Sequence, residues 1–409
     1  MIHKTANVSS IKPQFDGTSR LFMKNTIRTL FISIIATLLI FLTPAWAKMS
    51  EPTYVKNPYS ITINAKSWIL INQKTGQIIT SHQMHQQHAP ASLTKIMTAY
   101  LVAQYLKNGD LTLDTKIPVS QHSSSKRGSR MFIETGARIS VKNLLHGMII
   151  QSGNDAATAL AEYIGGTEKS FVHLMNDTAE KLGMNETHFA TPDGLPSDTE
   201  QYTTAYDMAI LSRAFIKQFP DIFKIYSKNQ FTWNDIKQLN RNVILKEFDG
   251  ADGMKTGYTK AAGYNLIATA KRNKTRYTAV VLGAPSPAAR ALDASRLLRV
   301  AFTHYTNKVF YQKGDTFSIS ADKIQNAKNL DATLEVFHPY TVTQTLRKSL
   351  VDELVYKLTL KKGIHAPITE NQPVGHLVVQ TDQDKTLAKI ALYAQNSIQR
   401  ASLWQRLFR

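Results

Sequence analysis

The stretch "HAPASLTKIMTAYLVAQYLKNGD" (residues 88–110) places a reactive pair of side chains at the start of an apolar helical pattern. Pro90 stands just before the pattern and Gly109 ends it, which are typical positions for these residues at helix boundaries. The apolar side chains that recur at helical spacing are Leu93, Ile96, Met97, Tyr100 and Leu101. The stretch therefore predicts a buried amphipathic helix with Ser92 in its first turn.

Ser92 and Lys95 form a Ser-x-x-Lys pair, which is a weak pattern by itself. It also occurs at Ser9, Ser123 and Ser320, but only Ser92 opens a strongly periodic apolar helix. Side chains at positions i and i+3 share a helix face, so the Lys95 amine should reach the Ser92 hydroxyl. The helix N-terminus would favour an oxyanion there. Lys95 must be neutral to act as a base, although a lysine pKa is normally about 10.4, and burial or a neighbouring cation can lower it.

Two later motifs contain the groups that such a pair would need. Ser152-Gly153-Asn154 follows Ser92 by 60 residues, and Lys255-Thr256-Gly257 follows Ser152 by 103. The first offers a hydroxyl and an amide. The second offers a cation and a hydroxyl for a carboxylate, and its glycine leaves room at a strand backbone. Ser152 as a helix cap, and Lys95 and Lys255 as surface lysines, stay open as simpler readings.

A second Lys-Thr-Gly, at residues 74–76, lies inside "SWILINQKTGQIITSHQ" (residues 67–83). Apolar and polar residues alternate on both sides of it, which predicts a β-hairpin with Gly76 in the turn. We expect no chemistry from this copy.

Residues 1–47 resemble a secretory signal. The apolar run Leu30–Leu42 is 13 residues long, short for a membrane span, and "Ala45-Trp46-Ala47" is typical of a cleavage site. The mature chain would begin near Lys48, and an uncleaved anchor is the alternative. The chain has no cysteine, which excludes disulfides and thiolate chemistry.

The net charge of +19 includes five Lys/Arg and one Asp in residues 1–47, which leaves +15 on the mature chain. This excess favours anionic surfaces as partners, whereas nucleic acid is not expected for an exported chain. The sequence predicts an α/β part over residues 48–304, an all-β part over 305–393 and an amphipathic helix over 394–409.

The apolar face of that last helix would contain Ile398, Ala401, Trp404, Leu407 and Phe408. We interpret it as an in-plane membrane anchor. A helix that docks on its own β part is the alternative.

The order of the three motifs resembles the active-site serine enzymes that act on penicillin-like and D-alanyl substrates. From about residue 53 onward the chain resembles serine D-Ala-D-Ala carboxypeptidases of the type-5-like low-molecular-mass penicillin-binding proteins. The blocks that carry the resemblance are "ASLTKIMTAY", "GSRMFIETGARISVKNLLHGMIIQSGNDAATALAEYIGG", "TPDGLPSDTEQYTTAYDMA", "DGMKTGYTKAAGYNLIATA" and "APITENQPVGHLVV". The resemblance implies a β-lactamase/transpeptidase-like α/β catalytic domain, with an antiparallel sheet, flanking helices and a helical subdomain. A small all-β domain and a C-terminal amphipathic helix would follow.

The resemblance also implies roles for individual residues. Ser92 would be acylated by the penultimate D-alanine, with Lys95 as the general base. Ser152 would relay a proton to the departing D-alanine, and Asn154 would have a positioning role. Lys255 would tune the electrostatics of the site.

Substrate-binding roles follow in the same way. The backbone N–H groups of Ser92 and Tyr258 would form the oxyanion hole beside Gly257. Thr256 would bind the terminal carboxylate, with Arg241 and Arg290 as secondary candidates. Many relatives have histidine where this chain has Tyr258, so any side-chain role there is open.

The resemblance thus implies a periplasmic enzyme, peripheral at the inner membrane. It would act on peptidoglycan stem peptides, bind β-lactams covalently and need no metal or organic cofactor. A DD-endopeptidase, a β-lactamase and a catalytically silent penicillin-binding scaffold remain as alternatives.

Overall fold

The structure is a computed structural model that describes residue 55 and residues 57–407. The predicted signal segment 1–47, Phe408 and Arg409 lie outside the described residues. Within the described part, no helix is both long and apolar enough to cross a membrane.

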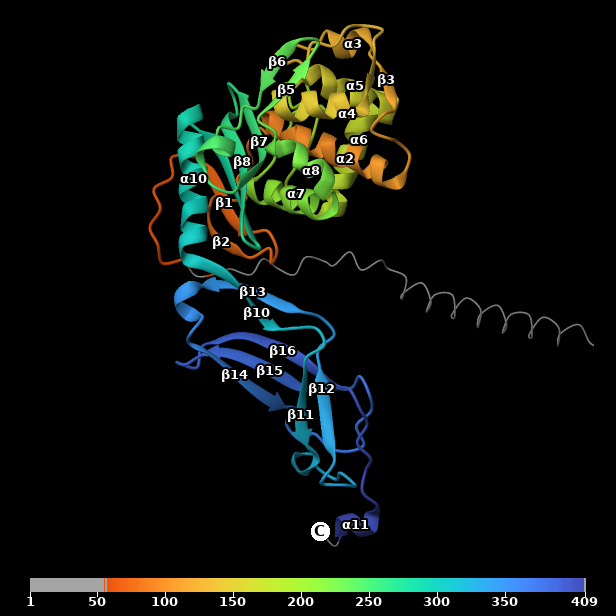
Figure 1. Cartoon of the computed structure of the whole chain (residues 1–409), viewed down its shortest axis with the longest axis vertical. Coiled ribbons are helices and arrows are strands. Elements are labelled where there is room, and N and C mark those ends of the chain that lie inside the picture. The colour runs from red at the N-terminus through yellow and green to blue at the C-terminus, as the bar shows by residue number, and fades with distance from the viewer. Residues whose placement is uncertain (1–54, 56, 408–409) are drawn as a thin grey trace, which may run out of the picture. The chain divides into compact units, whose positions relative to one another are not determined.

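A five-stranded antiparallel sheet forms the centre of the first part of the chain (Figure 1). Its strands, in spatial order, are β2 (Ile78–His82), β1 (Ser67–Asn72), β9 (Thr275–Ala284), β8 (Gly263–Arg272) and β7 (Ala251–Thr259). The predicted hairpin is confirmed as β1 and β2. Its turn contains the first Lys-Thr-Gly, with Gly76 at φ 74°. Arg213 holds this turn by donating from Nε to the Gln73 carbonyl, 3.1 Å away. The first copy is therefore structural.

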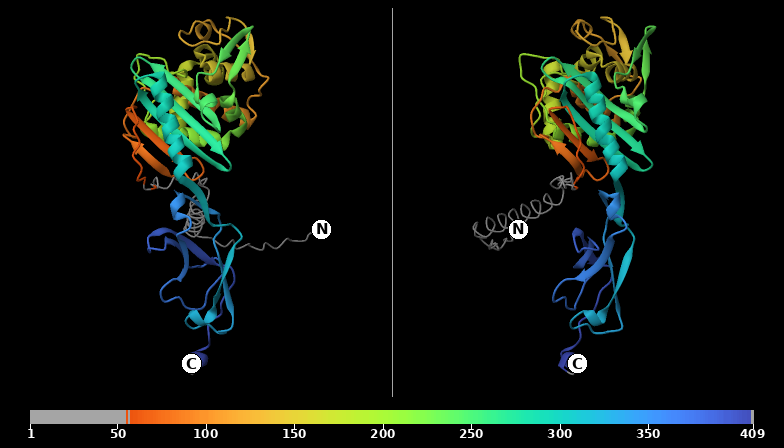
Figure 2. Two further views of the ribbon diagram at one scale, coloured as in Figure 1. Left: turned by 60° about the vertical axis from the view of Figure 1, so that its left-hand side comes forward. Right: turned by 90° about the vertical axis from the view of Figure 1, so that its left-hand side faces the viewer.

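The sheet separates two apolar cores because alternate strand residues face opposite sides. Trp68 and Leu70 pack with helix α10 (Pro287–His304), while Ile69 and Ile71 face the other helices. Figure 2 shows α10 lying across its face of the sheet. Both faces are thus covered, which explains the near-continuous apolar runs in the strands.

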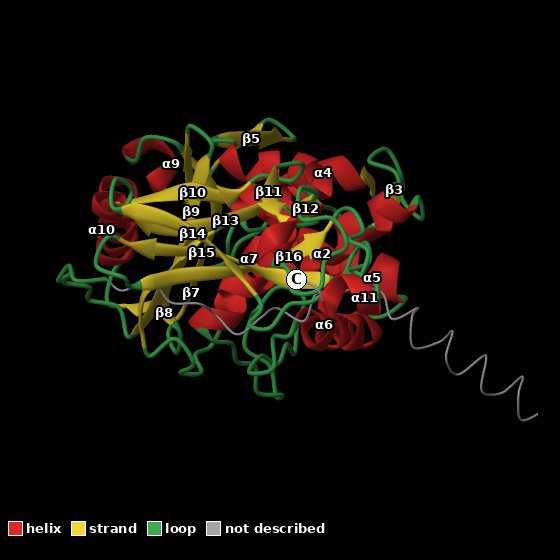
Figure 3. Cartoon of the chain, turned by 90° about the horizontal axis from the view of Figure 1, so that it is seen from below, coloured by secondary structure: helices red, strands yellow, loops and turns green. Residues whose placement is uncertain are grey.

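The helical elements gather on the second face (Figure 3). They are η1 (Ala91–Thr94), α2 (Lys95–Asn108), α3 (Gln121–Ser124), α4 (Val141–His146), η2 (Gly147–Gln151), α5 (Asn154–Gly165), α6 (Glu168–Leu182), α7 (Ala205–Gln218), α8 (Pro220–Phe223) and η3 (Lys224–Ser227). The short helix α9 (Ile244–Glu247) is on the other face, because Ile244 belongs to the core that α10 covers. Two small hairpins accompany them, β3 (Lys116–Pro118) with β4 (Arg138–Ser140), and β5 (Gln230–Trp233) with β6 (Ile236–Leu239). The helix predicted to contain Ser92 begins as a 3-10 turn, η1, and continues as α2.

The second part of the chain is all β, as predicted. Strands β10 (Tyr305–Tyr311) and β13 (Val342–Arg347) form one pair. A five-stranded antiparallel sheet has the order β11 (Thr316–Ser320), β12 (Thr333–Phe337), β16 (Thr386–Ala394), β15 (Pro373–Thr381) and β14 (Leu354–Leu360). This part has a hydrophobic core of its own.

The C-terminal helix is much shorter than predicted. Residues 395–402 are not helical, and Ile398 and Ala401 are each only 4% exposed. Ile398 packs into the β core, and the Ala401 N–H donates to the Asn326 carbonyl at 2.8 Å. Ile398 pairs with Ile368 in a β-bridge. The prediction of a single helix over 394–409 is therefore wrong for this stretch, because packing against the β sheet takes side chains that helical periodicity assigned to a membrane face. Within the described residues, helix α11 spans Leu403–Leu407.

Candidate active site

The Ser92 turn is shaped by backbone packing on both of its sides. Ala91 has φ 49°, a left-handed conformation that is rare for a residue with a Cβ and occurs mainly at functional sites. Gly257 of β7 lies against this turn, since an added Cβ there would be 3.1 Å from the Pro90 carbonyl oxygen. The Lys-Thr-Gly strand and the Ser92 turn are therefore in direct contact, which the sequence distance between them does not reveal.

Lys95 is the centre of the polar contacts. Its Nζ lies 3.0 Å from Ser92 Oγ, 2.7 Å from Asn154 Oδ1 and 2.5 Å from the Asp193 carbonyl oxygen. Asn154 Nδ2 donates to the Arg127 carbonyl at 2.6 Å, which fixes the orientation of the amide. The predicted contact between Ser92 and Lys95 is present.

These partners impose a direction on a neutral Lys95 amine. Asn154 Oδ1 and the Asp193 carbonyl can only accept hydrogen bonds, so they take the two N–H groups of the amine. The remaining lone pair then faces Ser92 Oγ. An amine held in this way can accept the hydroxyl proton without rearrangement.

Burial makes the neutral form of Lys95 accessible. The residue is 1% exposed, and desolvation lowers its pKa from 10.5 to about 8, with a smaller lowering by Arg241. Asp193 and Asp155 oppose that shift. The pKa of Lys255, which is 3% exposed, is lowered well below its ordinary value by burial, then by Lys95 and the nearby arginines. Two buried lysines that repel each other cannot both stay charged at neutral pH without strong compensation.

Ser152 and Asn154 reach the site through an unusual local structure. The residues before them, η2, form a π-helix that ends at Ser152, whose φ is 69°. Such π-turns are frequent at functional sites. Ser152 is 3% and Asn154 2% exposed, so both are buried, and Asn154 contacts Lys95 through its Oδ1. The simpler reading of Ser152 as a helix cap is not borne out, because Gly153 occupies the N-cap of α5.

Two residues that the sequence reading missed hold this wall in place. Asp155 is fully buried, and its carboxylate accepts backbone N–H bonds from the 131–133 loop at 2.9, 2.8 and 3.3 Å. Gly194 follows Asp193 with φ 79°, and an added Cβ would lie 1.9 Å from the Ala91 carbonyl oxygen. The adjoining "SGND" and "TPDG" turn signals were the only sequence clues to these two positions.

Two arginines, Arg241 and Arg290, supply positive charge, and within the described residues neither forms an ion pair with a carboxylate. Arg290 Nη1 donates to the Gly257 carbonyl at 3.4 Å, and burial lowers the Arg290 pKa to about 10. Arg241 is close enough to Lys95, Lys255 and Arg290 to lower the pKa of each. The site is therefore strongly electropositive and suits an anionic ligand.

Tyr258 ends the motif at the mouth of the site. Its side chain is 54% exposed and stacks on Tyr264 of β8, with the ring centroids 4.4 Å apart. The two residues are directly opposite in the β7–β8 register. Tyr258 thus presents an exposed aromatic surface next to Gly257.

Both parts of the chain match known protein families. The D-alanyl-D-alanine carboxypeptidase family matches residues 51–286, and the penicillin-binding protein 5 C-terminal domain matches residues 305–400. The D-alanyl-D-alanine carboxypeptidase DacD of Escherichia coli (strain K12) is 38% identical over 359 residues, which is 86% of this chain and 91% of that protein.

Two solved structures share the fold over most of the chain. The D-alanyl-D-alanine carboxypeptidase DacD from Francisella tularensis superimposes with a TM-score of 0.76 and 38% identity, covering 88% of this chain and 99% of its own. Penicillin binding protein 5 from Haemophilus influenzae superimposes with a TM-score of 0.75 and 32% identity. That match covers 84% of this chain and 100% of its own. The predicted α/β catalytic domain followed by a β domain is thereby confirmed. On these matches, which extend over both of its domains, the chain belongs to the D-alanyl-D-alanine carboxypeptidase family.

Proposed function

We propose that this protein is a serine DD-carboxypeptidase that removes the terminal D-alanine from peptidoglycan stem pentapeptides. The observation that carries the proposal is the Lys95 amine, whose two N–H groups are engaged so that its lone pair faces Ser92 Oγ. The family match and the names of the relatives support the substrate class.

In the acylation step, Ser92 Oγ attacks the carbonyl carbon of the penultimate D-alanine while its proton moves to Lys95. The backbone N–H groups of Ser92 and Tyr258 stabilise the negative charge on the carbonyl oxygen. Collapse of the tetrahedral intermediate breaks the C–N bond. The departing amine receives the proton from Lys95 through the Ser152 hydroxyl, so D-alanine leaves as a neutral amine and an ester remains on Ser92.

Binding and deacylation use the same groups. Thr256, Arg241 and Arg290 hold the terminal carboxylate, and Lys255 tunes the electrostatic potential of the site. Burial and Arg241 keep the pKa of Lys95 low. A water molecule then hydrolyses the ester, with its proton taken by the lysine base. A β-lactam would acylate Ser92 in the same way, but its amine stays tethered, which explains a long-lived adduct. The name of the penicillin binding protein 5 relative supports this extension.

The proposal is tested with the wild-type protein. D-alanine release from a stem pentapeptide should be measured beside the digestion of cross-linked muropeptides. Intact mass spectrometry with benzylpenicillin, followed by peptide mapping, should place one long-lived adduct on the peptide that contains Ser92.

The other outcomes separate the alternatives. Faster cleavage of cross-links would indicate an endopeptidase, and rapid loss of the adduct with production of penicilloic acid would indicate a β-lactamase. An adduct without D-alanine release would indicate a silent penicillin-binding protein. Absence of both reactions would overturn the proposal.

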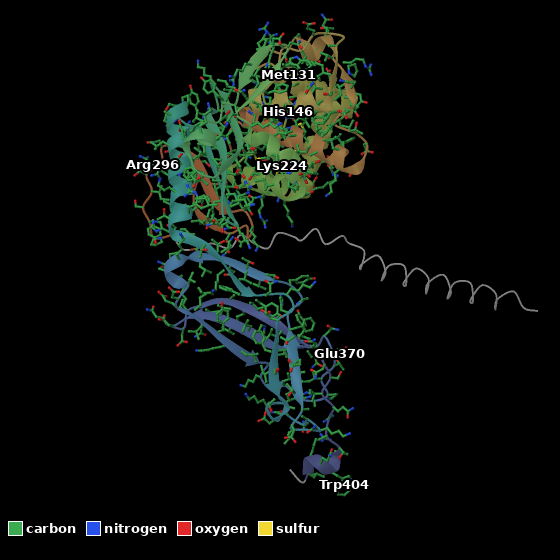
Figure 4. All side chains as sticks on the ribbon, in the orientation of Figure 1. Met131, His146, Lys224, Arg296, Glu370 and Trp404 are labelled. Atoms are coloured by element: carbon green, nitrogen blue, oxygen red, sulfur yellow. The ribbon has the colours of Figure 1, made fainter. Side chains whose placement is uncertain are left out.

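We further propose that the protein is held at the periplasmic face of the inner membrane by its last residues. Leu403, Trp404 and Leu407 are 69%, 72% and 74% exposed, and Trp404 is labelled in Figure 4. Each such side chain contributes roughly 1.5–3 kcal/mol when it enters an apolar phase. Arg400 and Arg406 lie close by and would favour anionic lipid.

The packing of Ile398 and Ala401 decides where a truncation should be made. A cut after Ser402 leaves the β core intact, and we expect the truncated protein to move from the membrane fraction to the soluble periplasmic fraction. A Tyr340→Ser variant, which removes a 70% exposed aromatic side chain elsewhere in the β domain, should stay membrane-bound. Continued membrane association of the truncated protein would instead indicate an uncleaved N-terminal anchor.

A further inference from the structure

Two separate segments bring side chains to the candidate site from different directions. The first is η2, which follows His146 directly and ends at Ser152. The second is the β5–β6 hairpin, which is followed by Asn240 and Arg241. The contacts between these segments therefore bear on the geometry of the site.

His146, which is labelled in Figure 4, is the last residue of α4. It is 8% exposed. Its Nδ1 is 2.6 Å from the Lys142 carbonyl, which can only accept, so Nδ1 carries the proton. Its Nε2 is then an acceptor, and Lys228 Nζ lies 2.9 Å away. The Phe231 ring of β5 covers the imidazole at a centroid distance of 5.5 Å. The neutral tautomer of His146 satisfies both contacts.

Hydrogen bonds connect the backbone at Lys228 to the turn that contains Arg241. The Lys228 carbonyl accepts a hydrogen bond from Asn240 Nδ2 at 3.0 Å, and the neighbouring Asn229 carbonyl accepts from Asn240 N at 2.8 Å. Asn240 Oδ1 in turn accepts from Asn242 N at 3.0 Å, which closes a turn around Arg241. The position of Arg241 therefore depends on the placement of Lys228.

We propose that His146 and Lys228 form a pin that joins the Ser152 segment to the β5–β6 hairpin, and that this pin positions Arg241 for the carboxylate of the ligand. Both are positioning residues that act through Arg241. The inference rests on the proposed function, since it gives Arg241 a carboxylate to bind.

The pin responds to protonation of His146. Burial contributes most to the lowered His146 pKa, and the hydrogen bond to the Lys142 carbonyl opposes it. The charged groups that face the imidazole are Lys228 from the hairpin side and Lys142 of α4, and both charges lower the pKa. A protonated imidazole has no acceptor left for Lys228 and would place two cations together. The pin is thus intact above the His146 pKa and is lost as pH falls through it, at a pH below the ordinary histidine value of 6.5.

The test compares acylation by benzylpenicillin with acylation by its methyl ester, which lacks the carboxylate. His146→Leu and Lys228→Met should each lower the acid-to-ester rate ratio by about tenfold, because a displaced positioning group loses its ligand contact. His146→Gln, whose amide retains one donor and one acceptor, should keep the wild-type ratio. Lys224→Met is the matched control, since it removes the same charge from an exposed pair with Asp221 nearby.

The pH dependence supplies a second readout. The acylation rate of the wild type by benzylpenicillin should be divided by that of His146→Gln, because titration of Lys95 affects both proteins and cancels in this ratio. The ratio should be constant near pH 8 and fall in acid, where only the wild type has a His146 to protonate. In ¹⁵N NMR spectra the His146 pKa should rise in Lys228→Met, since a neighbouring cation is removed.

Three results would overturn the pin. They are an unchanged acid-to-ester ratio in Lys228→Met, an equal loss with both β-lactams, and a His146 pKa that does not respond to Lys228→Met. Should His146→Leu fail to fold, the measurements on Lys228→Met decide, because Lys228 is more exposed and its substitution disturbs the fold less. Failure of the proposed function is a different result, namely no acylation of the wild-type protein by either β-lactam, and the NMR titration then still decides whether the pin exists.

Discussion

Ser92→Ala is expected to abolish the covalent penicilloyl adduct and to lower D-alanine release by about 10⁴- to 10⁶-fold, the range seen when a nucleophile that acts together with its base is removed. The substitution deletes only the hydroxyl and leaves Lys255 and the Arg241 and Arg290 cations in place. Reversible binding of a stem peptide should therefore change only a few-fold. Intact mass spectrometry and equilibrium dialysis measure the two effects separately.

The chain contains its own control for this experiment. Ser320 and Lys323 repeat the Ser-x-x-Lys spacing in the β domain, and Ser320 is exposed. Ser320→Ala should keep full adduct formation and turnover. An undiminished adduct in Ser92→Ala would show that another residue is the nucleophile.

The sequence predicted the fold where local pattern and tertiary packing agree. The hairpin at residues 67–83, the all-β character after residue 305 and the Ser92–Lys95 contact all follow from periodicity or fixed helical spacing. These features depend on residues that are close together in the sequence, so the periodicity of apolar and polar residues is sufficient to predict them.

The rest depended on contacts that sequence spacing cannot reveal. The left-handed Ala91 backbone is built by a close approach of Gly194, about a hundred residues away, and the 131–133 loop is tied by the Asp155 carboxylate. The π-helix before Ser152 has no periodicity signal of its own. In the tail, Ile398 packs in the β core and Ala401 is buried as well, which outweighs their helical spacing. The sequence pattern does not show which surface an apolar side chain packs against.

Lys95→Met is the second large effect, and it tests the base rather than the nucleophile. Loss of a general base costs about 10²- to 10⁴-fold in rate, so acylation of Ser92 by benzylpenicillin should fall by that factor. Asn154 Oδ1 and the Asp193 carbonyl would lose their donor, which destabilises the fold by about 1–3 kcal/mol per group. The melting temperature must therefore be followed beside the rate.

The pH profile identifies which lysine is the base. A base must be unprotonated, so wild-type acylation should rise with pH through the Lys95 pKa of about 8, and this limb should vanish in Lys95→Met. Asp193 opposes the lowering of that pKa, so Asp193→Asn, which preserves the backbone carbonyl contact with Lys95, should move the limb to lower pH. If the limb persisted in Lys95→Met at its wild-type position, the proton acceptor would be another group, and Lys255, the second buried lysine with a lowered pKa, would be the candidate. A limb that disappears in Lys95→Met and shifts downward in Asp193→Asn is explained only by proton transfer from Ser92 to Lys95.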